Sequence, residues 1–530
     1  MPLVGPPLPP STPLSDLLSR GLGGDAAAAA LSTADASLSW AELDRRSRVL
    51  AGTYRRLGLR PGDRVASLLP NRLDAVLHVL ACLRAGLAAT PLNYRYRSPE
   101  IGRALQLSGA RWLLFHAERQ GDVDGCRERS GLDLGCTPIV DGRDGQLADQ
   151  IETATAAGRD AAAGAAVAAV EERFAADAPA LIFFTSGSTG VPKGVVHDRR
   201  SLEALVNAYG RNFHLTAADR YLIASSMAHI GGLLGCLSSL CLGTPVLVAR
   251  SSDAAELERM LLTFRPTVVK MLPSTLFSLV RDPQAPGDAF TSLRECCVAG
   301  DHVPPELHSE FHHRTGLHIS EMYAMTEAGM LAANRGGDAD RTGSVGPAAV
   351  GVHLQIRGDD GRPLQAGETG DLWARSPCLM QGYWRDPKAT AEALVEGWLA
   401  TGDRMRADAD GVLWFAGRRR QIIVHDGSNI CPQEVEDALL EHPAVTGAVA
   451  IGIHDLVHGE NVRAYVTLDP GAVPPDEAEL IAFARARIGY KAPTGVVVLD
   501  QLPLNATGKV DRPAVRALAQ CVAVAADQQC

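Results

Sequence analysis

Several features that would assign this protein to a special class are missing from its sequence. None of its 11 cysteines forms a CxxC pair, and the closest spacings are Cys236 with Cys241 and the adjacent Cys296 and Cys297. This pattern fits neither a disulfide framework nor a zinc site, so we expect a reducing, cytoplasmic location. The first residues lack the basic start and continuous apolar core of a secretory signal.

Long hydrophobic runs and an excess of positive charge are missing as well. No apolar stretch reaches the roughly 18 residues of a membrane-spanning helix, so no membrane span is expected. The net charge of -10 and the pI of 5.9 argue against a nucleic-acid-binding protein. At 530 residues, with roughly 100–200 residues per domain, the chain should form several domains.

The order of apolar patterns predicts an α/β fold. Short buried strands are expected at RVASLL, YLIASS, PVLVA, TVVKML and ECCVAG, with helical patterns between them. This rhythm is typical of βαβ units and a largely parallel sheet. Between residues 343 and 414, short strands and Gly-rich turns predict a small antiparallel β module. We therefore expect a large N-terminal domain (1–419) of two α/β subdomains plus this module, and a small, mobile α+β C-terminal domain (420–530).

The stretch FFTSGSTGVPKGVV, residues 183–196, has the composition of a phosphate-binding loop. Backbone N–H groups and hydroxyls can surround phosphate oxygens, and a lysine adds a positive charge. The ordinary P-loop is excluded because Lys193 follows a proline, and the dinucleotide fingerprint lacks its third glycine. A plain Gly/Ser surface turn is the alternative, and the loop alone does not decide between the two. The candidate ligands are Thr185, Ser186, Gly187, Ser188, Thr189, Gly190 and Lys193.

Further motifs follow in a fixed order and remove this ambiguity. They are SSMAHIGG (225–232), EMYAMTEAG (321–329), WLATGDRMRADADGVLWFAGRRRQIIVHDGSNICPQEVE (398–436) and LPLNATGKVDR (502–512). Together with TSGSTGVPKGV, they resemble the adenylate-forming superfamily of acyl-CoA synthetases, luciferases and peptide-synthetase adenylation domains. The resemblance covers nearly the whole chain and is closest to the acyl-CoA synthetases.

This resemblance implies a reaction in two halves. A carboxylate attacks the α-phosphate of ATP and releases pyrophosphate, and a thiol, usually of coenzyme A, then takes the acyl group and releases AMP. Lys193 and the loop would hold the β- and γ-phosphates. Thr326 would contact the phosphates, Glu327 would bind Mg²⁺, and Tyr323 would lie against the adenine.

The resemblance assigns further roles to residues toward the C-terminus. Asp403 would bind the ribose hydroxyls, and Arg418 would reach the ribose or phosphate. Arg420 stands at the hinge position, where Asp or Lys is more usual. Lys509 would bridge the acid and the α-phosphate during adenylation, and Gly427 would help line the CoA tunnel after the C-terminal domain rotates.

The acid itself is less well indicated. His229 matches a catalytic gatekeeping position near the acyl carboxylate. Ile230 stands where amino-acid-activating relatives carry Asp, so an amino acid's ammonium would be left unpaired. An apolar acid is therefore expected, and a fatty acid is favoured. The other pocket candidates are Ala299, Gly300, Met322, Ala324 and Met325, although ordinary core packing explains the methionines equally well.

Free CoA is the expected acceptor. The stretch between Glu327 and Asp403 is too short for the insertion that often marks relatives serving carrier proteins. The alternative is a stand-alone enzyme that loads an acyl or aryl acid onto a separate carrier protein. A non-catalytic nucleotide sensor is disfavoured because Lys193 and Lys509 are both present, and nothing in the sequence supports a luciferase.

Overall fold

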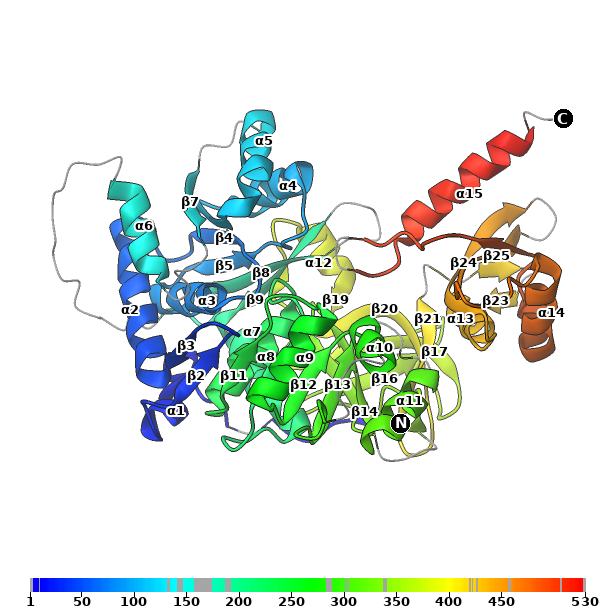
Figure 1. The fold of residues 1–530 in the computed structure, drawn as a ribbon, viewed down its shortest axis with the longest axis horizontal. Helices are drawn as coiled ribbons and strands as arrows, with labels where there is room; N and C mark the ends of the chain where they lie inside the picture. The colour runs from blue at the N-terminus through cyan, green and yellow to red at the C-terminus, as the bar shows by residue number, and fades with distance from the viewer. Residues whose placement is uncertain are drawn as a thin grey trace. The chain divides into compact units, whose positions relative to one another are not determined.

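The described residues of the chain fold into mixed α/β units built on four sheets (Figure 1). This computed structural model describes residues 3–8, 10–130, 134–140, 146–156, 174–185, 192–282, 288–300, 303, 305–336, 341–418, 421, 423–425, 428–455, 459–505 and 508–527. The larger of two compact units contains Pro2–Leu354 and Ala374–Leu399. The smaller contains Gln355–Trp373 and Ala400–Cys530.

The first sheet has seven strands, most of them parallel. Their order is β18 (Gly382–Tyr383), β9 (Lys193–Asp198), β8 (Pro179–Thr185), β5 (Ala88–Pro91), β4 (Arg64–Leu68), β6 (Trp112–His116) and β7 (Gly135–Ile139). Strand β4 confirms the strand expected at RVASLL. Strands β9 and β18 run antiparallel at one edge. Helices around this region are α2 (Trp40–Arg56), α3 (Leu73–Ala85), α4 (Ser98–Ser108), α5 (Gln120–Ser130) and α6 (Leu147–Ala156).

The second sheet has eight strands and contains the other four expected ones. Their order is β15 (Gly329–Asn334), β14 (Ile319–Met325), β13 (Glu295–Ala299), β12 (Val268–Met271), β10 (Tyr221–Ile223), β11 (Val246–Val248), β2 (Ala29–Ser32) and β3 (Ser37–Ser39). All neighbours from β14 to β2 are parallel, and the edge strands β15 and β3 are antiparallel. The parallel strands therefore place their carboxyl ends along one edge, where α/β sheets bind their ligands.

Helices cover both faces of this second sheet. On one face, Val269 and Met271 pack in a core with α9 (Ala254–Phe264), α10 (Pro273–Arg281) and α11 (Pro305–Thr315). On the other face lie α7 (Arg199–Tyr209) and α8 (Ile230–Cys241). A Cβ atom added to Gly235 of α8 would lie 2.8 Å from the Tyr221 hydroxyl of β10, so the helix approaches the sheet closely.

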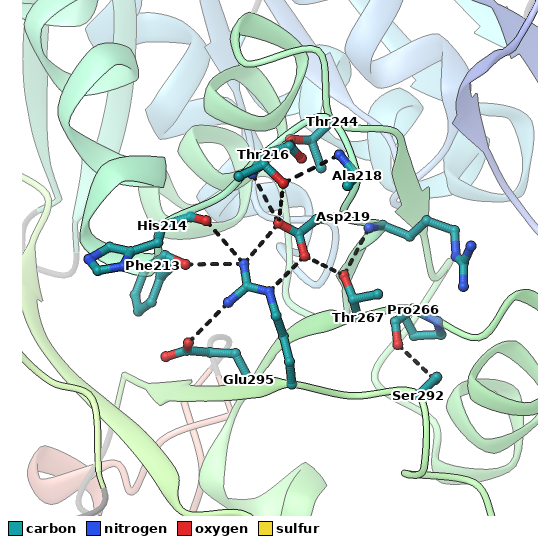
Figure 2. A network of polar contacts seen from close by, with 12 residues as sticks. Phe213, His214, Thr216, Ala218, Asp219, Thr244, Pro266, Thr267, Ser292 and Glu295 are labelled. Carbon is teal, nitrogen blue, oxygen red and sulfur yellow. Dashed lines mark hydrogen bonds and ion pairs between the residues drawn. The ribbon is translucent and has the colours of Figure 1, made fainter.

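A polar network holds the opposite, amino-terminal edge of the same strands (Figure 2). Asp219 accepts hydrogen bonds from Arg294 Nε (2.7 Å), Thr267 Oγ1 (2.8 Å) and the Thr216 backbone (2.9 Å). Burial alone would raise the pKa of Asp219, but these hydrogen bonds lower it to about 2. Because Asp219, Thr267 and Arg294 all precede strands, this network stabilises the sheet at the edge away from the carboxyl ends.

Apart from the strand Leu3–Val4, the strands of the remaining two sheets come from residues 353–498. The expected β module is a six-stranded sheet of β1 (Leu3–Val4), β16 (His353–Arg357), β17 (Thr369–Arg375), β20 (Trp398–Ala407) and β19 (Leu394–Val395), with β21 (Leu413–Arg418) paired to β20. The last sheet contains β23 (Ser428–Ile430), β22 (Ile423–His425), β25 (Gly459–Leu468), β24 (Val445–Asp455) and β26 (Gly495–Val498). The other helices are α1 (Ser19–Gly23), α12 (Pro387–Ala393), α13 (Pro432–Leu440), α14 (Glu477–Ile488) and α15 (Arg512–Asp527). No helix in the described part of the chain combines the length and hydropathy needed to cross a bilayer.

Candidate active site

The predicted phosphate loop connects the hairpin of β8 and β9. Thr185 ends β8 and Lys193 begins β9, and the two are partners in the antiparallel register. The Lys193 ammonium lies 4.7 Å from the centroid of the Tyr383 ring, a cation–π distance. The structure thus fixes both ends of the loop. Between them, the predicted ligands Ser186, Gly187, Ser188, Thr189 and Gly190 lie outside the described residues.

Thr326 and Glu327 lie in the turn between β14 and β15. This turn reaches Tyr383, the residue whose ring also lies near Lys193. The Tyr383 hydroxyl donates a hydrogen bond to Glu327 Oε1 at 2.9 Å. The backbone N–H of Met380 donates to the Glu327 carbonyl at 2.7 Å. Burial raises the pKa of Tyr383, and the adjacent Glu327 carboxylate raises it further, so the phenol stays protonated and remains a donor.

Tyr383 is a site residue that the sequence analysis missed. It lies on the edge strand β18, which pairs with β9 through Gly382↔Val196 and Tyr383↔Val195. It therefore connects Lys193 to Glu327, two groups more than 130 positions apart in the sequence. The only local signal was the Gly-Tyr-Trp stretch at 382–384, which has no distinctive spacing of its own.

His197 is a second residue that the sequence analysis missed, and it forms a hydrogen bond with the turn that contains Thr326. Its Nε2 donates to the Thr326 carbonyl at 2.8 Å, and its Nδ1 lies 3.3 Å from Ser201 Oγ. The side chain is fully buried. Burial lowers the pKa of His197 to about 4, so the imidazole is neutral at physiological pH and keeps its role as donor.

Two asparagines hold the SSMAHIGG segment. Asn71 donates to the Ser225 carbonyl at 2.9 Å and accepts from the Met227 N–H at 2.8 Å. Asn93 Nδ2 lies 3.4 Å from Nε2 of His229. His229 precedes α8 as its N-cap, half-buried, and Ile230 is the first residue of the helix and is buried.

The predicted acyl-pocket residues cluster at the carboxyl ends of β13 and β14. Ala299 and Met322 are register partners on these strands, and both are buried. Gly300 follows β13 with a φ of 104°, which only glycine adopts readily. Ala324 is exposed and Met325 is half-buried at the end of β14, near the half-buried Tyr323. The structure thus groups the predicted pocket residues at one edge of the sheet.

The predicted ribose ligands lie together in the smaller unit. Asp403 and Arg418 are register partners of β20 and β21, and Arg418 Nε lies 3.0 Å from Asp403 Oδ1. Asp403 is 5% exposed, whereas Arg418 reaches into solvent. A buried carboxylate that is oriented by a solvent-exposed guanidinium is suited to accept hydrogen bonds from a diol.

Lys509 is exposed on a tight turn in the smaller unit. The Asn505 N–H donates to the Lys509 carbonyl at 2.7 Å, and Asn505 Oδ1 accepts from the Lys509 N–H at 3.2 Å. Next to the turn, Arg512 contacts the buried Glu436 at 2.6 Å. Two hydrogen bonds with Asn505 therefore position the backbone of Lys509, and the residue itself is exposed. The predicted hinge Arg420 and tunnel residue Gly427 lie outside the described residues.

The donor set near Glu327 fits a magnesium ion that arrives with its nucleotide. Among the described residues, no cluster of three or more His, Cys, Asp or Glu side chains could hold a metal ion. Mg²⁺ commonly binds one or two protein carboxylates together with substrate phosphates and water. A single carboxylate near the predicted phosphate loop would meet that requirement.

Comparison with known proteins agrees with this geometry. Residues 22–384 match the family "AMP-binding enzyme", and residues 434–509 match "AMP-binding enzyme C-terminal domain". A feruloyl-CoA synthase of Amycolatopsis sp is 33% identical over 485 residues, covering 91% of this chain and 94% of the relative. A sulfoacetate–CoA ligase of Cupriavidus necator is 31% identical, covering 90% and 91%. The crystal structure of ATP-bound MatB from Rhodopseudomonas palustris matches with a TM-score of 0.84 at 26% identity, covering 95% and 98%.

Proposed function

We infer the roles of individual residues from the premise that this chain belongs to the AMP-binding enzyme family and is an ATP-dependent acid–CoA ligase. Its co-substrates are ATP and CoA. The observation that carries the proposal is the contact series from Lys193 through Tyr383 to Glu327. It places a cation, a phenol donor and a carboxylate at the base of a phosphate-type loop.

In the first half-reaction, Lys193 and the loop would bind the phosphates that leave as pyrophosphate. Negative charge grows on these oxygens as the P–O bond breaks, and fixed donors stabilise it. Thr326 would add a hydroxyl, with its backbone held by His197. Lys509, exposed at the end of its turn, would neutralise the attacking carboxylate and the α-phosphate.

Glu327 would hold a magnesium ion together with the nucleotide's phosphates. The ion supplies charge neutralisation at the phosphates when it is bound. Tyr383 orients the Glu327 carboxylate and occupies one of its lone pairs, which limits the directions left for a cation.

We propose that the acid is apolar next to its reacting carboxylate and that it is not an amino acid. Buried Ile230 at the start of α8 provides no partner for an α-ammonium group. A fatty acid is the simplest candidate of this kind. The two relatives named above act on different acids, ferulate and sulfoacetate by their names, so they do not select one.

For the second half-reaction we propose free CoA as the acceptor, after the C-terminal domain (420–530) rotates and removes Lys509. Asp403 and Arg418 would hold the AMP ribose through both halves. A separate carrier protein as acceptor is the alternative. A cytoplasmic location belongs to this proposal and is supported by nine cysteines, from Cys82 to Cys431, that are free thiols.

One assay tests the function and the acceptor together. Purified enzyme, ATP and Mg²⁺ are combined with a panel of fatty, aryl and amino acids, and pyrophosphate release is measured with no thiol, with CoA or with a phosphopantetheinylated carrier protein. We expect release with apolar acids and thioester formation with CoA. Thioester formation on the carrier alone would replace CoA as the acceptor, and activity confined to amino acids would contradict the reading of Ile230.

A further inference from the structure

A buried lysine beside the candidate acyl pocket has no part in the steps above. Lys270 lies on β12 and is only 7% exposed. Burial lowers its pKa to about 8, so most of the ammonium remains protonated at pH 7. A buried charge is normally paired with an opposite charge or fully hydrogen-bonded, because leaving water without such a partner is unfavourable.

The part of the chain that the structure describes offers Lys270 no such partner. Among the described residues, none is recorded as accepting a hydrogen bond from its Nζ or forming an ion pair with it. Two neighbouring groups are the Tyr209 ring, with its centroid 5.9 Å from Nζ, and the Cys297 thiol. Burial raises the pKa of Cys297 well above its usual range, so that thiol is neutral.

The carboxylate closest in register is already engaged. Glu295 lies two positions before Cys297 on β13 and therefore shares a face of the sheet with Lys270. It binds Arg335 at 2.9 Å and accepts from Ser320 Oγ at 2.6 Å. Its charge is therefore satisfied on the far side of β13.

The Lys270 ammonium faces a second positive feature, the amino end of α8. A Cβ atom added to Gly231 would lie 2.2 Å from Nζ, so Gly231 leaves the space that the ammonium uses. No side chain caps this 12-residue helix, and no described residue is recorded as accepting a hydrogen bond from the N–H of Ile230 or Gly231. A helix amino end favours anions and disfavours a cation. The two positive groups therefore create a site for a negative charge.

The sheet register places Lys270 two residues further from the carboxyl ends of the strands than the predicted pocket residues Ala299 and Met322. Lys270 pairs with Cys297, and Ala299 follows two positions later on the same face, paired with Met322. Two residues along a strand span about 7 Å. An acid that enters from the carboxyl edge would pass Ala299 and Met322 before its far end reaches Lys270.

We propose that Lys270 and the first turn of α8 bind a second acidic group, a carboxylate or sulfonate, at the far end of the acid substrate. The acid then has an apolar middle, which lies against Met322 and Ile230, and an anion at each end. This inference rests on the proposed ligase function and specifies its substrate class.

The test compares acids that differ only at the far end. Full-length enzyme is assayed by pyrophosphate release with α,ω-dicarboxylates from C4 to C10 and with monocarboxylates of the same lengths. We expect one length of dicarboxylate to exceed its monocarboxylate partner in kcat/KM by about 10- to 100-fold, as a charge-assisted hydrogen bond would give. Equal kcat/KM for each pair at every length would overturn the proposal while leaving the ligase function intact. No pyrophosphate release with any acid of the broader panel would instead contradict the ligase function.

Two variants separate binding of the far group from a structural role. Lys270→Met keeps the apolar stem and should abolish the dicarboxylate preference while leaving monocarboxylate kcat/KM within about threefold. Gly231→Ala, which places a methyl group where Nζ lies, should weaken the same preference without removing any charge. Lys388→Met, on the exposed surface of α12, is the matched lysine control. An equal loss toward both acids in Lys270→Met would assign Lys270 to the common carboxylate or to folding. A dicarboxylate preference kept by both variants would show that Lys270 does not bind the far acidic group.

Discussion

At the scale of single residues, Lys509 allows the sharpest test of the two half-reactions. Its turn is closed by Asn505, so truncating its side chain should leave the backbone unchanged. Lys509→Ala should lower acid-dependent pyrophosphate release at least about 100-fold, because it removes a charge that acts only in the transition state. Thioester formation from prepared acyl-AMP and CoA should be nearly unaffected. An equal loss in both assays would refute the role assigned to Lys509.

Tyr383 provides a second residue-scale prediction. Tyr383→Phe keeps the ring beside Lys193 but removes the hydrogen bond to Glu327. A lost hydrogen bond to a charged acceptor is worth about 1.5–3 kcal/mol, so kcat/KM for ATP should fall about 10- to 100-fold. The Mg²⁺ concentration for half-maximal activity should rise, because Glu327 loses its orienting donor. Tyr383→Leu, which removes the ring as well, should be worse. An unchanged Mg²⁺ dependence in Tyr383→Phe would separate Glu327 from the metal.

These residues also show what the sequence can predict at this scale. Lys193, Glu327, Asp403 and Lys509 stand in motifs that resemble those of a known family, so the sequence alone is enough to propose them as site residues. The contacts of Tyr383, by contrast, exist only because β18 pairs with β9 across a gap of nearly 190 positions. A side chain whose role depends on such pairing leaves no local pattern in the sequence.

At the scale of elements, the turn between β14 and β15 depends on a neutral histidine in β9. His197 has a pKa of about 4 in the folded protein and an ordinary value of 6.5. In the unfolded chain, the His197 imidazole therefore becomes protonated below about pH 6.5, whereas in the folded protein it stays neutral down to about pH 4. The free energy of unfolding therefore has its full value above pH 6.5 and decreases as the pH falls toward 4. The decrease is about 2 kcal/mol between pH 7 and pH 5.

His197→Gln keeps an amide donor for the Thr326 carbonyl but cannot titrate. Urea unfolding at pH 7 and pH 5 should show that the wild type loses about 2 kcal/mol more than the variant. His78, which is also buried with a pKa of about 4, remains in both proteins and cancels in the comparison. Equal losses in the two proteins would mean that His197 is not held neutral by the fold.

The elements themselves were predictable to different degrees. Strands β4, β10, β11, β12 and β13 were expected because short apolar runs between helical patterns identify buried parallel strands. The division into two α/β subdomains was expected as well, but the order of the strands within each sheet was not, since apolar runs do not encode their partners. Lys270 illustrates the same limit, because within TVVKML it interrupts a core strand and only the register shows that it faces α8.

At the scale of the whole molecule, the proposed mechanism requires the C-terminal domain to rotate in each catalytic cycle. The rotation removes Lys509 from the active site and forms the tunnel through which CoA enters. Arg420 is the proposed pivot, and a pivot must permit a change of backbone angle. Proline fixes φ near −65°, so Arg420→Pro should trap one arrangement of the domains. The expected result is a thioester-forming rate that falls at least about tenfold more than the rate of acyl-adenylate formation. Arg420→Ala leaves φ free and should keep both rates within about threefold of the wild type. If Ala were as harmful as Pro, the side chain and not the backbone would matter; if Pro slowed both steps equally, Arg420 would not be the pivot.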